Sequence, residues 1–163
     1  MDVRTALKNQ HHAALAMMRQ AIEAAPEHVW LGGEHPRNYW RIAFHALAYA
    51  HLYLFPNLAE WEKWEHHRQD CTYLEGDDVP VAEPYTRAQM LEFCEVTDQM
   101  VDAKIDVMDL DEPTCGYTWY PTVSRLELQI LSLRHLHGHI GQLTEIMIAN
   151  GLDVTWLGGR PTP

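Results

Sequence analysis

Apolar residues recur along most of this chain at the three- and four-residue spacing of an amphipathic helix, and no segment shows the alternation of a strand. The first stripe predicts a helix over 3–24, with Asp2 as its N-cap and Pro26 after its end. A second helix is predicted over 38–55, stopping before Pro56. It is apolar on nearly every side, which is typical of a helix in the middle of a bundle.

Two further helices are predicted from their capping boxes, in which a hydroxyl residue is followed three positions later by Gln or Glu. One begins at Thr86 and ends near Asp109. The other begins at Ser124 and runs to Asn150, and Gly151 suits the position after a helix end.

These segments predict an all-α fold, a four-helix bundle that forms a single domain over residues 1–163. A long irregular crossover, residues 57–84, joins helices 2 and 3. Because it is long for a bundle connection, it is either functional, as a lid or dimer contact, or a passive surface crossover. Trp61 and Trp64 lie within it in a charged stretch.

Charge argues against several classes of partner. The 12 Lys and Arg residues against 23 Asp and Glu give a formal net charge of -11. A field of that sign repels nucleic-acid phosphates and anionic lipid surfaces. We therefore expect no nucleic-acid partner and no membrane partner.

Cysteine usage predicts a cytoplasmic protein. Cys71, Cys94 and Cys115 are odd in number and widely spaced, which indicates reduced thiols. No signal peptide is visible. The longest apolar stretch, 42–55, is interrupted by histidines and is too short to span a membrane.

His135 and His139 are the strongest chemical signal. Four residues advance a helix by roughly 400°, so both imidazoles leave one face and are spaced to bind one metal ion. The alternative is a histidine pair on a solvated helix surface. Apolar residues on the same stripe favour a core-directed face, where imidazoles need a partner. These are Leu128, Leu131, Leu143 and Ile146.

A third ligand has to come from another helix, and His45 is the best candidate because it lies mid-helix among apolar residues. The alternative is a core histidine bonded to a backbone carbonyl. His137 is about 200° around the helix from His135 and is expected to face away. His11 is expected in the core or near the site, and His66 and His67 in solvent.

Gly138 and Gln142 accompany the histidine pair. A glycine inside a helix costs roughly 1 kcal/mol relative to alanine, so Gly138 either leaves room for a substrate or allows a helix to pack closely. Gln142 projects toward the same interior, to hold a metal-bound water or a substrate, or to satisfy a buried backbone group. No spacing identifies catalytic residues.

Three neutral imidazoles bind a divalent transition metal such as Zn, Ni, Fe or Cu. Three protein ligands leave a coordination position open, which is typical of a catalytic site. A metal in such a site lowers the pKa of bound water or of a bound thiol.

Two stretches of this chain carry a family resemblance: residues 39–54 and His135-x-x-x-His139-x-Gly141-Gln142. They resemble the DinB-like (damage-inducible, YfiT-type) superfamily of four-helix-bundle metal-binding proteins. The resemblance implies that His45 is the third ligand, that the metal is Zn, Ni or Fe, and that the protein is a homodimer. Members include transferases and isomerases that use low-molecular-weight thiols, so it also implies metal-assisted thiol chemistry on a small-molecule substrate.

Two functions remain open at this point. The first is a metal-dependent S-transferase or hydrolase, in which a bound thiolate or hydroxide attacks an electrophile. The second is a non-catalytic stress-response module that holds a metal or small ligand, with the region of Trp61 and Trp64 contacting a partner.

Overall fold

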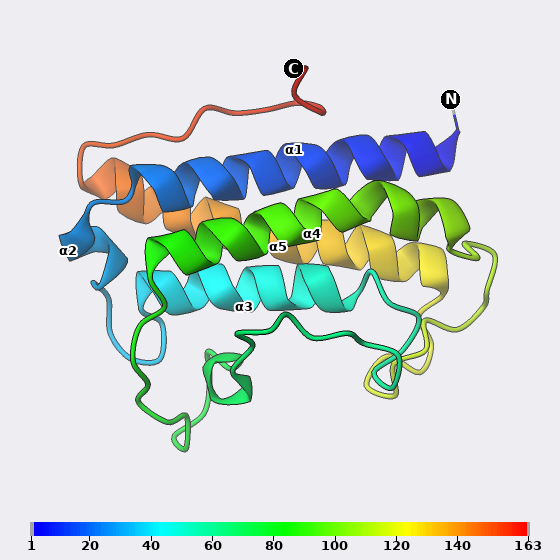
Figure 1. Ribbon diagram of the computed structural model, residues 1–163, viewed down its shortest axis with the longest axis horizontal. Helices are drawn as coiled ribbons and strands as arrows, with labels where there is room; N and C mark the ends of the chain where they lie inside the picture. Colours follow the sequence, from blue (N-terminus) through cyan, green and yellow to red (C-terminus); the bar gives the residue numbers. More distant parts are fainter. Residues whose placement is uncertain (1, 163) are drawn as a thin grey trace.

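The computed structural model describes residues 2–162 (Figure 1). Within this range all regular secondary structure is helical and there is no strand. The elements are α1 (Val3–Ala24), α2 (Glu27–Trp30), α3 (Tyr39–Leu52), the 3₁₀ turn η1 (Gln69–Cys71), α4 (Arg87–Val107) and α5 (Arg125–Ala149). The predicted all-α class is confirmed. The short elements α2 and η1 were not predicted, because neither is long enough to show a helical period.

The helix ends agree with their capping residues. The Asp2 side chain accepts from the backbone of α1, and the capping boxes of α4 and α5 are both formed. α3 ends at Leu52, earlier than predicted. Side chains from elsewhere stabilise that end, because Tyr117 donates to the Leu52 carbonyl at 2.7 Å and Gln129 to the Tyr53 carbonyl at 2.8 Å.

The long helices pack in a closed set, in which α1 and α3 each contact both α4 and α5. α3 and α4 run in the same direction (Figure 1). The chain between them, residues 53–86, therefore has to return the length of a helix. Within residues 2–162 no helix is long and apolar enough to cross a membrane.

The segment 53–86 is fastened to the helices by buried side chains. The fully buried guanidinium of Arg41 donates to the carbonyls of Asp70 at 3.1 Å and Pro80 at 2.8 Å. Trp64 stacks on Phe93 of α4, with ring centroids 4.4 Å apart. These contacts hold the irregular segment in place beside α3. The Trp64 ring is buried inside the protein.

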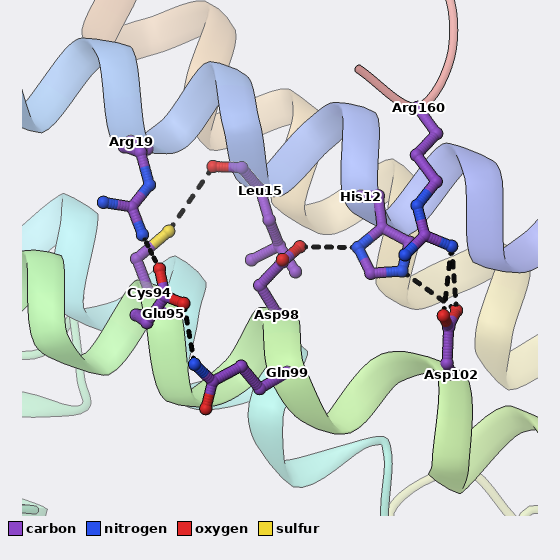
Figure 2. A network of polar contacts seen from close by, with 9 residues as sticks. All are labelled: His12, Leu15, Arg19, Cys94, Glu95, Asp98, Gln99, Asp102 and Arg160. Carbon is purple, nitrogen blue, oxygen red and sulfur yellow. Dashed lines mark hydrogen bonds and ion pairs between the residues drawn. The ribbon is translucent and has the colours of Figure 1, made fainter. Parts of the chain in front are cut away.

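A polar network joins α1 to α4 (Figure 2). The buried ring of His12 lies between two carboxylates, with Nδ1 2.7 Å from Asp98 and Nε2 3.0 Å from Asp102. Arg160, from the segment after α5, binds Asp102 at 3.0 Å. The hydrogen bond from His12 holds the pKa of Asp102 below its usual range. The His12 imidazole thus connects α1 with α4, and Asp102 connects both to the C-terminal segment.

We predict that His12→Ala lowers the free energy of unfolding by about 1–3 kcal/mol, because two helix-joining hydrogen bonds and a buried ring are lost. The matched control is Lys8→Ala, which removes a more exposed α1–α4 ion pair with Asp106 and should cost less than about 1 kcal/mol. Urea unfolding of both variants measures the difference. Equal losses would contradict the importance of the His12 network.

Two buried histidines outside this network are held neutral. Burial lowers the pKa of His11 and of His51 to about 4. The indole of Trp61 donates to Nδ1 of His51 at 2.9 Å, and since an indole can only donate, that nitrogen must keep its lone pair. Protonation of His51 would break this bond.

Stability should therefore fall on acidification. An unfolded histidine titrates near 6.5, so as the pH drops from 6.5 toward 4 the unfolded chain binds protons that the native state does not. Each of the two residues should remove about 1.4 kcal/mol per pH unit inside this window. We predict that His51→Asn, which keeps an acceptor for Trp61, flattens the loss between pH 6.5 and pH 4.5. Urea unfolding at several pH values tests this, with the exposed His28→Asn as control, and an unchanged slope in His51→Asn would refute it.

Candidate metal centre

α3 and α5 pack side by side and bring three histidines to one point. Nε2 of His135 lies 3.0 Å from Nε2 of His45 and 3.1 Å from Nε2 of His139. The ligand atoms of all three lie within 4.8 Å of one another. The structure therefore places the third candidate, from a helix 90 residues away in sequence, with the predicted pair.

Two of the three rings are oriented from outside the cluster. Nδ1 of His45 lies 2.6 Å from the carbonyl oxygen of Thr72, which only accepts, so this nitrogen carries the proton. Nδ1 of His139 lies 2.9 Å from Oε1 of Gln142. Arg37, which only donates, binds the same Oε1 at 3.3 Å, so that atom is an oxygen and Nδ1 of His139 is also a donor. In the neutral rings both Nε2 atoms therefore present lone pairs to His135.

Converging lone pairs repel one another unless a proton or cation lies between them. Neutral His135 can donate from Nε2 to one neighbour only, whereas a cation satisfies all three rings. Two imidazoles bound to one ion at about 2.0–2.1 Å have nitrogens roughly 3.0–3.4 Å apart. The observed separations of 3.0 and 3.1 Å lie in that range, so this donor set fits a divalent transition metal.

The electrostatics of the cluster keep the rings in their metal-binding form. Burial, with the nearby imidazoles, lowers the pKa of His135 to about 3. Burial also lowers the pKa of His45 to about 4, and it lowers that of His139. Neutral imidazole is the form that binds metal, so protons compete weakly with a metal at neutral pH.

The predicted core-facing position of the pair needs correction. His135 and His139 are half-buried and lie at the edge of the buried stripe of α5. The buried positions of that helix include Ser132, Leu136, Ile140, Leu143 and Met147. The two ligands are one residue, or about 100°, away from this stripe, and they face cavities and not the packed core.

The structure excludes one of the two roles expected for Gln142 and one of the two expected for Gly138. Gln142 is exposed and binds Nδ1 of His139, so it orients a ligand ring and does not satisfy a buried backbone group. A Cβ at Gly138 would have no neighbour within 4 Å, so close helix packing is not the reason for this glycine. Gly138 instead lines an open cavity with both histidines of α5.

The other histidines are not ligands of the cluster. His11 is a core residue, and His137 packs its ring against Trp156, away from the cluster. His66 is exposed, as predicted. The prediction of a solvated His67 is wrong, because both its ring nitrogens are buried and its ring lies edge-on to Trp61. The crossover folds back over α3, and this covers the ring nitrogens of His67.

The cluster lies between two cavities. One, of about 510 Å³, is lined by His45 and His135 together with mainly aromatic side chains. The other, of about 370 Å³, is lined by His135, His139, Gly138, Gln142 and Arg134. Space for ligands is therefore present on both sides of the histidines.

Sequence reasoning missed the groups that come from irregular segments. The Thr72 carbonyl and the Arg37 guanidinium lie in loops without a period. The periodicity of α3 offered one usable signal, because Tyr49 follows His45 by one helical turn. Its ring lies 4.9 Å from that of His45 and 5.3 Å from that of His135.

Comparisons with models of protein families, with curated proteins and with solved structures gave no match. The candidate metal centre is therefore supported by the geometry of this chain alone.

We predict that the purified protein binds about one equivalent of Zn²⁺ or Ni²⁺, and that His45→Ala, His135→Ala and His139→Ala each reduce it below about one-tenth of an equivalent. Elemental analysis after incubation with metal and gel filtration measures the content. The matched control is His137→Ala, from the same helix but outside the cluster, which should bind like the wild type. A metal-free wild type after this treatment would rule out the centre.

Proposed function

We propose that this chain is a DinB-like four-helix-bundle protein, and that it is a metal-dependent transferase acting on a low-molecular-weight thiol. His45, His135 and His139 would be the metal ligands. The observation that carries this proposal is the convergence of their three Nε2 atoms at a point open to cavities on two sides. A purely structural metal site is closed by a fourth protein ligand, whereas a site open to cavities has room for a reactant.

A divalent ion in this site would supply Lewis acidity, which lowers the pKa of a thiol that binds to it. The chain offers no sulfur nucleophile of its own. Its three cysteines are buried, and burial raises the pKa of Cys94 to about 12. The sulfur therefore has to come from a second molecule.

Arginines on one side of the cluster suit the carboxylates that low-molecular-weight thiols such as glutathione and bacillithiol carry. Arg134 lines the smaller cavity, and Arg37 reaches its edge through Gln142. Guanidinium groups bind carboxylates in a two-point geometry. In a chain with a net charge of -11, two arginines beside the histidines favour an anionic co-substrate there.

The chain's own residues would orient the reactants. Thr72 and Gln142 fix the rings of His45 and His139, and Arg134 holds the thiol by its carboxylate. In the reaction a sulfur–carbon bond forms, the bond from that carbon to its leaving group breaks, and the thiol proton is released to solvent. Holding both reactants beside each other lowers the entropic part of the barrier.

We predict that the metal-loaded protein catalyses substitution of the chloride of a chlorodinitrobenzene by the sulfur of glutathione, bacillithiol or mycothiol, with release of chloride and a proton. Absorbance of the thioether product measures the rate. His139→Ala should lower kcat/KM at least about 100-fold, whereas His137→Ala should not change it. Arg134→Ala should raise KM for glutathione or bacillithiol about tenfold with little change in kcat, because its contact with their carboxylates is the same in ground and transition states. Bound metal without turnover of any of these thiols or of simple esters would favour the non-catalytic binding module instead.

A further inference from the structure

The larger cavity has an unusually uniform lining. Six aromatic side chains surround it: Tyr49, Tyr53, Trp61, Tyr73, Trp119 and Tyr120. Its volume of about 510 Å³ lies in the range that encloses a small organic molecule, roughly 300–1,000 Å³. His45 and His135 also line it. Anything bound in it would lie against the metal-binding cluster.

The mouth of this cavity is apolar and exposed. Leu58, Tyr73 and Trp119 are 53%, 51% and 45% exposed, and all three line the same cavity. Single exposed apolar residues are ordinary, whereas a group of them around one concavity is typical of a binding site. Exposure of these three side chains to water costs free energy, and a bound apolar group would remove that cost.

No Asp, Glu, Lys or Arg side chain among the described residues lines the cavity, and the basic groups that do line it are the imidazoles of His45 and His135. An anion would lose its hydration there without gaining a guanidinium or ammonium partner. A cation would find aromatic faces, but no carboxylate, and it would lie next to the site proposed for a divalent ion. The lining therefore favours an uncharged ligand.

We propose that this cavity binds an uncharged aromatic group, which belongs to the electrophilic second substrate. The aromatic rings would pack edge-on and offset against it, and the Tyr49 hydroxyl, one helical turn from His45, would be available as a hydrogen-bond donor. The proposal rests on the proposed function for the identity of the second substrate, but the binding itself does not require the metal. The two substrates would then approach the histidines from different cavities, the neutral ring from the aromatic one and the anionic thiol from the one that Arg134 lines.

Calorimetric titration of the full chain with three unreactive probes tests the proposal: 4-nitrobenzyl alcohol, 4-nitrobenzylammonium and 4-nitrobenzenesulfonate. The neutral alcohol should bind at least about tenfold more tightly than either ion, because only the ions pay for lost hydration. Trp119→Ala and Tyr73→Ala should each weaken the alcohol about tenfold. Both positions are exposed, so both variants should fold. The matched control is Trp156→Ala, an exposed tryptophan outside the cavity, which should leave binding unchanged.

The outcomes separate this proposal from the proposed function. Binding of the alcohol that persists in metal-deficient His139→Ala, and weakens in Trp119→Ala, supports the cavity assignment even if no thiol transfer is found. Tighter binding of the ammonium probe would overturn it in favour of a cation cage. Equal binding of the alcohol to wild type and Trp119→Ala would also overturn it. The proposal would also be overturned if the wild type bound no probe and Trp119→Ala changed the molecular mass of the protein in solution. The mouth of the cavity would then be a contact between protein chains.

Discussion

Three imidazole nitrogens that face one another are the constraint on which this structure depends. Two of them are turned inward because their opposite nitrogens donate to Thr72 and Gln142. The third, on His135, lies within 3.1 Å of both. Such an arrangement is costly in a protein without a shared cation, and its separations are those that a cation produces. The packing of α3 on α5 therefore brings together three imidazole nitrogens that repel one another when empty and that one shared cation would satisfy.

The irregular segment between α3 and α4 is as important to this site as the helices. Since these helices run in the same direction, the chain has to return along α3, and it does so against the ring of His45. Buried Arg41 fixes that return by binding two of its carbonyls, on Asp70 and Pro80. Thr72, two residues after Asp70, then presents its carbonyl to His45. The buried guanidinium of Arg41 thus fixes the backbone segment whose Thr72 carbonyl orients the ring of His45.

The surroundings of the histidines differ sharply on their two sides. One cavity is aromatic and carries no formal charge, and the other is smaller and bordered by Arg134. Tyr120 and His135 line both, so the two spaces meet at the cluster. This asymmetry would suit the two unlike substrates of the proposed transfer, because each could be bound by chemistry that rejects the other.

The sequence by itself determined the helical class, most helix ends and the histidine pair of α5, because these follow from local hydrogen bonding and from a period of 3.6 residues. It also singled out His45, since a histidine among apolar neighbours needs a partner. Only the tertiary structure decided that the pair lies at the edge of the core stripe, that Thr72 and Arg37 orient the candidate ligands, that the ring nitrogens of His67 are buried, and that a neutral cavity adjoins the site. These features depend on irregular segments and on how the helices pack, and both are set by contacts between residues far apart in the chain.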